Sequence, residues 1–401
     1  MLSKKEKTIV IAGGGNAGIS LAARLRRTHP HWRVRLVEPS DKHYYQPAWT
    51  MVGGGFYDVR KTVREMEKVI PSGVEWLKDA VVGFLPEKNH VILASGEKVY
   101  YDALVVALGI RLMWDAVKGL PETLGKNQVC SVYEFHLAAY TAECIRQFRG
   151  GRALFTAPDT PVKCGGAPQK IMYLAADAFQ RRGLTAQHMN IEFWSGGTRV
   201  FAVEKYEKTL LRVIQRYGIQ THFRRRLEAV DGPGKKAVFR DISPEGEGRV
   251  FEESFDLLHV TPPQGPPQVV SSSPLADEKG WVAADKYTLQ HPRWSNVFAL
   301  GDCAGLPVSR TGAAIRKQVP VVVQNLEAVL SGTPPQARYN GYSSCPILTG
   351  KGRLVLAEFD YDLKPLETFP FDQSKERWSM FALKRYILPW LYWNKILTGK
   401  M

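Results

Sequence analysis

The sequence predicts an α/β protein with two Rossmann-like dinucleotide-binding-type domains, the first of which is split by the insertion of the second. Three segments predict this fold: a strand followed by a glycine-rich loop near the start, a strand that ends in a glycine at position 109, and a strand that ends in Gly301-Asp302. They occur in the order in which a split nucleotide-binding domain begins, is interrupted and resumes. An amphipathic C-terminal region follows the two domains.

The composition narrows the class of protein. A chain of 401 residues with 44% hydrophobic and 23% charged residues has room for two or three globular domains. The formal net charge of +15 suggests an anionic partner, which could be nucleic acid, acidic lipid headgroups or an anionic small substrate. No zinc-finger spacing and no aromatic RNA-binding motif is present, which speaks against nucleic acid. Five cysteines without a C-x-x-C pair speak against a metal site and against a disulfide-stapled secreted fold.

A glycine-rich loop directly follows the first predicted strand, Thr8–Ala12. Its glycines have the spacing G-x-G-x-x-G: Gly13, Gly15 and Gly18. They allow a tight turn, a close approach of the backbone to a pyrophosphate, and close packing of helix on strand. A second strand, Arg33–Val37, ends in Glu38, twenty residues past Gly18, where an acid binds the adenosine ribose. Together these features predict a dinucleotide site.

Two later segments favour FAD over NAD as the dinucleotide. Residues 101–109 resemble the segment that closes the FAD domain of two-dinucleotide-fold flavoproteins, and residues 296–302 resemble the second FAD signature of that family. In that signature the aspartate, here Asp302, accepts hydrogen bonds from the ribityl chain. The candidate FAD-binding residues are Gly13, Gly15, Asn16, Ala17, Gly18, Glu38, Gln46, Val81, Ala107, Gly109, Gly301 and Asp302.

The predicted domains follow from these segments. The FAD domain comprises residues 1–112 and 285–335, the inserted Rossmann-like domain residues 113–284, and the C-terminal region residues 336–401. The elements expected in the insertion are strands at 151–156, 190–194 and 255–261, a helix that begins near Ala167, and a helix over Glu204–Tyr217. Apolar spacing in the last helix predicts four inward residues: Leu210, Leu211, Val213 and Ile214.

The inserted domain lacks the second glycine motif that a nicotinamide nucleotide needs. Residues 157–166 carry two prolines and Lys163, with no glycine where a pyrophosphate would require one. The following strand ends in Trp194-Ser195-Gly196, without an acid for a ribose. The sequence therefore speaks against nicotinamide binding here.

That loop offers a cysteine instead, and a second cysteine has a similar setting. Cys164 lies just ahead of the helix that Pro168 marks, and the helix N-terminus together with Lys163 favours a thiolate, although a buried structural cysteine is the alternative. Cys345, bordered by turn residues and followed by Pro346, is predicted to be exposed and strained. The remaining cysteines are expected to pack beside the flavin (Cys303) or to fill the core (Cys130 and Cys144).

Over essentially its whole length the chain is similar to the sulfide:quinone oxidoreductases, especially the form of mitochondria and related bacteria. The segments that carry the resemblance are residues 45–50, 160–173, 259–263, 342–345 and 366–377. The resemblance implies that Cys164 and Cys345 are redox cysteines near the flavin, bridged by a disulfide or trisulfide.

The same resemblance implies the reaction. Hydrosulfide attacks the bridge, by analogy at Cys345, which becomes a persulfide while Cys164 leaves as the thiolate that faces the flavin. Two electrons pass to FAD and on to a membrane quinone, and the sulfur leaves to glutathione, sulfite or a polysulfide. The residues alone leave open which cysteine has which role. Alternatives are a type II NADH:quinone oxidoreductase, the flavin subunit of a sulfide dehydrogenase that feeds a cytochrome, and a flavin-binding scaffold or redox sensor.

The tail, residues 378–397, mixes aromatic and aliphatic residues with lysine and arginine. This composition is typical of an interfacial anchor, with apolar side chains in the acyl chains and Lys384, Arg385 and Lys395 toward anionic lipid. Pro389 is expected to divide it into two short helices. The alternative is a helix pair packed on the protein's own core or on a second subunit of a homodimer.

An anchored tail would let quinone reach the flavin from the bilayer, past aromatics such as Phe359 and Phe369. The first seven residues contain neither an apolar signal-peptide core nor a transit segment. We therefore expect the cytoplasmic face of a bacterial inner membrane, or the mitochondrial inner membrane if a presequence has been removed.

Overall fold

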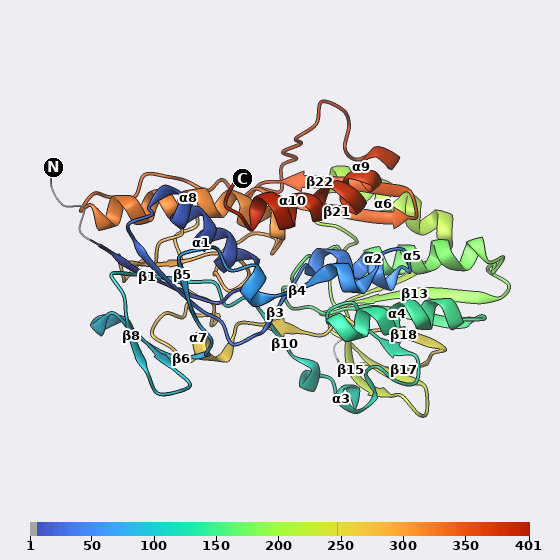
Figure 1. The fold of residues 1–401 in the computed structure, drawn as a ribbon. Coiled ribbons are helices and arrows are strands. Elements are labelled where there is room, and N and C mark those ends of the chain that lie inside the picture. Colours follow the sequence, from blue (N-terminus) through green and yellow to red (C-terminus); the bar gives the residue numbers. More distant parts are fainter. Residues whose placement is uncertain (1–5, 247) are drawn as a thin grey trace.

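Two five-stranded parallel sheets form the two lobes of the protein in the computed structural model, which describes residues 6–246 and 248–401 (Figure 1). The first sheet has the order β20-β9-β1-β2-β5: β20 (Val297–Ala299), β9 (Ala103–Val106), β1 (Thr8–Ala12), β2 (Arg33–Val37) and β5 (Val74–Leu77). The second has the order β11-β18-β12-β13-β14: β11 (Val129–Cys130), β18 (Leu257–His259), β12 (Gly151–Ala157), β13 (Met189–Ser195) and β14 (Gln220–Phe223). Residues 1–5 lie outside the described residues. The expectation about a signal peptide or transit segment concerns these residues in part.

The first sheet brings the predicted nucleotide segments to one edge. Ala12 pairs with Val37 on one side and with Val106 on the other, so the three strands end at the same level. Apart from Thr8, Arg33 and Arg35, their side chains are buried on both faces, as in a parallel sheet covered by helices. Helix α1 (Asn16–Thr28) packs against helix α8 (Gly312–Leu330) beside this sheet. The loops after β1, β2, β9 and β20 therefore meet at the carboxyl edge, where such folds bind ligands.

Helices of the inserted lobe follow its strands: α5 (Ala167–Arg181) follows β12, and α6 (Glu204–Tyr217) follows β13. A further helix, α4 (Phe135–Gln147), precedes β12. Helix α6 has the predicted bounds, but the prediction that Leu211 points inward is wrong, because its side chain is 48% exposed. Leu210, Val213 and Ile214 share the buried face, and Leu211 lies about 100° of helical rotation from Leu210.

Smaller elements complete the two lobes. Antiparallel sheets are formed by β6 (Val81–Leu85), β7 (His90–Leu93) and β8 (Lys98–Tyr100), and by β15 (Arg225–Asp231), β16 (Lys236–Asp241) and β17 (Val250–Ser254). Two-stranded pairs are β3 (Lys42–Tyr44) with β4 (Val63–Glu65), and β10 (Arg111–Leu112) with β19 (Gln264–Gly265). Short helices are α2 (Trp49–Gly53), α3 (Leu120–Thr123) and α7 (Gln268–Ser271).

A C-terminal hairpin packs on the inserted lobe. It consists of β21 (Ser343–Gly350) and β22 (Arg353–Phe359), and β21 lies against α5. Figure 1 shows the hairpin above α5, at the side of the molecule opposite the N-terminus. This packing joins a strand near the end of the chain to the helix that follows the Cys164 loop.

The tail forms one continuous helical segment, residues 378–396, which we call the C-terminal helix. It consists of α9 (Trp378–Ala382), a π-helical turn (Leu383–Ile387), α10 (Leu388–Leu391) and a second π-helical turn (Tyr392–Ile396). The prediction that Pro389 divides it is wrong. Pro389 lies in the first turn of α10, directly after a π-turn, and such wider turns accommodate a residue that lacks an N–H group. Across the described residues, the structure contains no helix long and apolar enough to cross a membrane.

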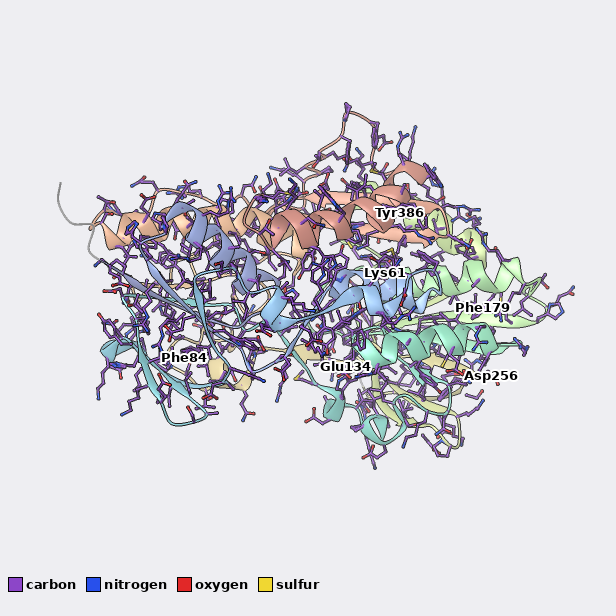
Figure 2. The ribbon with its side chains drawn as sticks, in the orientation of Figure 1. Lys61, Phe84, Glu134, Phe179, Asp256 and Tyr386 are labelled. Atoms are coloured by element: carbon purple, nitrogen blue, oxygen red, sulfur yellow. The ribbon has the colours of Figure 1, made fainter. Side chains whose placement is uncertain are left out.

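The C-terminal helix has one buried and one exposed face. Phe381, Tyr392 and Trp393 belong to the core of the first lobe, and the Tyr392 hydroxyl lies 2.7 Å from His43 Nε2. The exposed face carries large side chains: Trp378 is 69% exposed, Tyr386 61%, Ile387 49% and Trp390 53%. Figure 2 labels Tyr386 on this helix, above α2. The segment thus packs on the protein's own core, as the alternative predicted, and also presents an aromatic surface.

Candidate functional site

The loop between β12 and α5 holds Cys164 through contacts with three distant segments. The Cys164 N–H donates to the Arg310 carbonyl at 2.7 Å. The Lys163 N–H donates to Gln264 Oε1 at 2.9 Å, and Lys163 Nζ donates to Gln46 Oε1 at 2.7 Å. Gln46 and Arg310 come from the first lobe and Gln264 from β19, so the cysteine lies where the two lobes meet.

Cys345 lies beside Cys164, although 181 residues separate them in sequence. Their sulfur atoms are 3.9 Å apart and both thiols are free, a separation longer than the ~2.05 Å of a disulfide bond. Cys164 is partly buried, whereas Cys345 is 1% exposed on β21. The prediction of an exposed Cys345 is wrong. Cys345 lies within strand β21, which pairs with β22 and packs against α5, so its side chain is covered. The structure brings the two predicted redox cysteines together.

The backbone at this loop is shaped for a close approach of the two sulfurs. Cys164 has φ +52°, a left-handed conformation that is uncommon for a residue with a side chain and that often marks functional sites. A Cβ atom on Gly166 would lie 2.6 Å from Cys345 Sγ. A Cβ atom on Gly165 would meet no atom within 4 Å. Any side chain at position 166 would therefore displace the Cys345 sulfur from its present position.

We therefore expect Gly166→Ala to slow formation of a Cys164–Cys345 bridge about tenfold, since overpacking of this size costs about 1–3 kcal/mol. The measurement is the bridged fraction of the two cysteine peptides, followed by mass spectrometry during air oxidation. Gly165→Ala is the matched control and should bridge at the wild-type rate. Equal rates in both variants would show that Gly166 does not set the sulfur–sulfur approach.

Lys170 is the cation that contacts Cys164. Its Nζ atom lies 3.0 Å from Cys164 Sγ, and its side chain is buried in the first turn of α5. The hydrogen bond from the Cys345 thiol, followed by the charge and the hydrogen bond of Lys170, lowers the pKa of Cys164 well below its usual range. The same hydrogen bond to Cys164 raises the pKa of Cys345. In the reduced pair these opposite shifts favour the thiolate at Cys164 over the thiolate at Cys345.

The sequence assigned the role of that cation to Lys163, and the structure corrects this. The Lys163 ammonium donates to Gln46, and burial lowers its pKa to about 8. Lys170 reaches the sulfur because the helix beginning at Ala167 turns it back toward the loop. Burial opposes its charge, but the sulfurs of Cys164 and Cys345 raise its pKa above the usual value. No local pattern in the sequence distinguishes Lys170 from an ordinary surface lysine.

Lys384 brings the C-terminal helix into the site. The sequence placed it toward lipid, but it is only 3% exposed, and its Nζ atom donates to the Pro47 carbonyl at 2.9 Å. Burial and the neighbouring charge of Lys170 lower its pKa to about 7. Its charge in turn contributes to the low pKa of Cys164. Two buried lysines from different parts of the chain therefore face the thiol pair.

The glycine loop of the first lobe fits a dinucleotide. Gly13 has φ +107°, and a Cβ atom there would lie 2.5 Å from the Ala107 carbonyl oxygen. Gly15 caps α1 without a side-chain hydrogen bond, and a Cβ atom on it would meet nothing within 4 Å. Space therefore lies in front of free N–H groups at a helix N-terminus, which is the arrangement that binds phosphate. Glu38 closes the other side by accepting from the Gly14 N–H at 2.7 Å.

Other predicted FAD contacts lie around the same edge. A Cβ atom on Gly301 would lie 3.2 Å from Ala17 Cβ, one on Gly18 would clash with the Gly13 carbonyl, and one on Gly312 would lie 3.3 Å from Asn16 Nδ2. Gly109 has φ +74° and open space beside it. Val81 lies on β6, and its side chain belongs to the core of the first lobe, as do those of Ala17 and Ala107.

A small cavity of about 10 Å³ lies at this edge, lined by residues that include Gly301, Asp302 and Arg310. Arg310 Nε donates to the Asp302 carbonyl at 2.9 Å, and burial raises the pKa of the Asp302 carboxyl against the opposing charges of Lys163 and Arg310. Within the described part of the chain, the buried Thr261 Oγ1 and Gln264 Nε2 atoms have no hydrogen-bond partner. Unpartnered buried polar atoms of this kind are compatible with a bound polar cofactor such as FAD.

The other three cysteines take no part in this arrangement. Cys303 is buried, and its thiol donates to the Val106 carbonyl at 3.4 Å. Cys130 and Cys144 belong to the core of the inserted lobe. Residues 6–246 and 248–401 contain no group of three or more His, Cys, Asp or Glu that could hold a metal ion.

Comparisons with known proteins agree with these features. Residues 7–141 match the pyridine nucleotide-disulphide oxidoreductase family. The mitochondrial sulfide:quinone oxidoreductase of Mus musculus is 42% identical over 397 residues, which cover 99% of this chain and 88% of that protein. The X-ray structure of the sulfide:quinone oxidoreductase of Aquifex aeolicus superposes with a TM-score of 0.80 at 18% identity, over 97% of this chain and 92% of that one.

A protein related to the first alternative is more distant. The alternative NAD(P)H-ubiquinone oxidoreductase C1 of Arabidopsis thaliana is 26% identical over 350 residues, covering 75% of this chain and 62% of that protein. Similarity to the mouse protein extends through both lobes and the segments that carry Cys164 and Cys345. The chain belongs to the sulfide:quinone oxidoreductases, a family of FAD-dependent enzymes.

Proposed function

We propose that this protein oxidises sulfide at the Cys164–Cys345 pair, passes two electrons through FAD to a membrane quinone, and transfers the sulfur to a small acceptor. The observation that carries the proposal is the 3.9 Å separation of the two sulfurs, beside Lys170 and at the edge where the FAD segments meet. FAD bound at that edge supplies the two-electron acceptor.

The chemistry of the pair favours one order of steps. With the bridge formed, hydrosulfide attacks the Cys345 sulfur, the sulfur–sulfur bond breaks, and Cys164 leaves as a thiolate. A thiol of low pKa is the better leaving group. The hydrogen bond from Cys345, together with Lys170, lowers the pKa of Cys164, whereas the hydrogen bond to Cys164 and burial raise the pKa of Cys345 against the opposing charge of Lys170. The outer sulfur of the Cys345 persulfide then transfers to glutathione, sulfite or a growing polysulfide. Closing the bridge from the two resulting thiolates releases the two electrons.

The NADH-oxidising alternative finds little support in the inserted lobe. At the carboxyl end of β13, a Cβ atom on Gly196 would lie 2.5 Å from the Asp159 nitrogen, so the loop after β12 covers the strand end where a ribose would bind. Asp159 also accepts from Arg226 Nε at 3.1 Å. Asp159 is thus already paired with an arginine, and its loop lacks the glycine motif. Both features speak against a nucleotide site here.

A steady-state assay tests the proposed reaction. We expect the purified protein to reduce a soluble short-chain quinone when sulfide is supplied, and to do so faster with sulfite or glutathione present. The persulfide or thiosulfate product, identified by mass spectrometry, names the acceptor. Quinone reduction with NADH and none with sulfide would overturn the proposal.

The exposed face of the C-terminal helix supports attachment to the membrane that holds the quinone. We propose that it lies in the interface, on a mitochondrial inner membrane or on the cytoplasmic face of a bacterial one. We expect Tyr386→Ser and Trp390→Ser each to weaken binding to phosphatidylcholine vesicles at least tenfold, because each removes a large apolar surface from the bilayer. Flotation measures the bound fraction.

Tyr100→Ser is the matched control, since Tyr100 is 49% exposed on β8 in the first lobe. Point variants test the membrane contact alone, whereas removal of residues 378–401 would also remove Lys384 and the buried Tyr392. Vesicle binding that survives both tail substitutions would contradict the proposed attachment. A homodimer is compatible with this arrangement, and light scattering of the detergent-free protein tests it.

A further inference from the structure

A groove of about 670 Å³ lies outside the thiol site, between α4, the second half of α5, the end of α2 and the turn of the β21–β22 hairpin. Its apolar lining includes Phe56, Ile145, Leu174 and Ala178. Cationic side chains also line it, namely Arg146, Arg181, Arg182 and Lys351. Apolar surface beside several cations is a combination that neither the FAD site nor the thiol pair uses.

Three of the four cations have no acidic partner. Asp177 forms an ion pair with Arg181 at 2.8 Å, and Glu143 accepts from Gln147 at 2.8 Å. The other three cations have no carboxylate within ion-pair distance in the portion of the chain that the structure describes; they are Arg146, Arg182 and Lys351. Their charges are available to an external anion.

Arg182 is held at the groove by the end of α4. Its Nη2 atom donates to the Ile145 carbonyl at 2.9 Å, and its guanidinium lies 5.4 Å from the ring centroid of Phe179. Burial and the charge of Arg149 lower the pKa of Arg182. An anion placed here would relieve this repulsion between cations. Figure 2 labels Phe179 on α5, the helix that forms one wall.

Contacts on two sides join the groove to the C-terminal helix. The Phe56 ring lies 5.6 Å from that of Phe381 in α9, and the Arg385 guanidinium lies 5.6 Å from the Phe56 centroid. On the other side, a Cβ atom on Gly352, next to Lys351, would lie 3.6 Å from Trp378. If the exposed aromatics enter a bilayer, the groove opens at the level of the lipid headgroups.

We propose that this groove binds one anionic phospholipid, with the phosphate among Arg146, Arg182 and Lys351 and part of an acyl chain over Leu174, Ala178 and Phe56. The inference rests on the membrane attachment proposed above. A small polar anion would leave the apolar surface unused, and a neutral quinone would leave the cations unused. A volume of this size accommodates a headgroup and the start of a chain.

Vesicle flotation of the full-length, FAD-loaded protein tests the proposal with two compositions: pure phosphatidylcholine, and phosphatidylcholine with phosphatidylglycerol. The expected result is tighter binding to the anionic vesicles. Arg146→Gln combined with Lys351→Gln should weaken that binding at least tenfold and leave binding to pure phosphatidylcholine unchanged. Ala178→Trp, which fills the groove without changing charge, should reduce the preference for anionic vesicles in the same way.

The matched control is Lys88→Gln combined with Lys98→Gln, which removes two exposed charges from the turn between β6 and β7 and from β8. Less than a twofold effect is expected. Tyr386→Ser should weaken binding to both vesicle compositions, while the protein that remains bound keeps its preference for anionic vesicles. This result would distinguish the contribution of the C-terminal helix from that of the groove. Equal binding to both compositions, an unchanged preference in Ala178→Trp, or competition by inorganic phosphate as strong as by phosphatidylglycerol would each overturn the lipid site.

Discussion

Cys164→Ser is expected to lower sulfide-dependent quinone reduction by about 10³-fold or more while FAD remains bound. A serine hydroxyl can neither form the sulfur bridge nor leave from it as a stable anion at neutral pH, so the covalent route is lost. Cys345→Ser should fall by a similar factor because the two sulfurs act as one unit, and the double variant should be little worse than either single one. The measurements are turnover and the flavin absorbance of the purified variants.

Cys144→Ser is the control for these variants, since Cys144 is a buried core cysteine outside the site. It should keep its turnover, allowing for some loss of stability. Wild-type turnover in either Cys164→Ser or Cys345→Ser would remove that residue from the mechanism.

Lys170→Met has the second largest expected effect. The lysine charge lowers the pKa of Cys164, so its removal raises that pKa and reduces the thiolate fraction at neutral pH. We expect turnover at pH 7 to fall about 10- to 100-fold, because Cys164 becomes a poorer thiolate and a poorer leaving group without the contacting charge. Because the thiolate forms again above the raised pKa, turnover should recover as the pH increases toward 9.

Thiolate absorbance of the reduced protein, followed against pH, measures the shift directly. Lys163→Met is the matched control, since that neighbouring lysine donates to Gln46 and not to a sulfur. It should leave the cysteine titration in place. A Lys170→Met variant with a wild-type titration and a wild-type pH profile would show that Lys170 only packs.

Much of the fold could be predicted because its signals are local. Strand Thr8–Ala12, its glycine loop and helix α6 depend on a few neighbouring residues, and the observed bounds of β1, β2 and α6 equal the predicted ones. The proximity of Cys164 and Cys345 came only from resemblance to a family, because hairpin β21–β22 meets α5 through packing between distant segments. No spacing in the sequence encodes that contact.

The parts of the site that sequence reasoning missed are buried charges. Lys170 and Lys384 each look like ordinary helical lysines, and an amphipathic helix normally turns such residues to solvent or to lipid headgroups. Lys384 instead faces inward because the C-terminal helix packs on the first lobe through Tyr392 and Trp393. Only the tertiary structure reveals two cations beside a thiolate.

The central claim is that a thiol pair has replaced a nicotinamide as the electron donor to the flavin. Anaerobic titration of the oxidised protein, followed by the visible absorbance of the flavin, tests it most directly. We predict that sulfide bleaches the flavin, that NADH at the same concentrations does not, and that Cys164→Ser abolishes the bleaching by sulfide. Bleaching by NADH without bleaching by sulfide would contradict the claim.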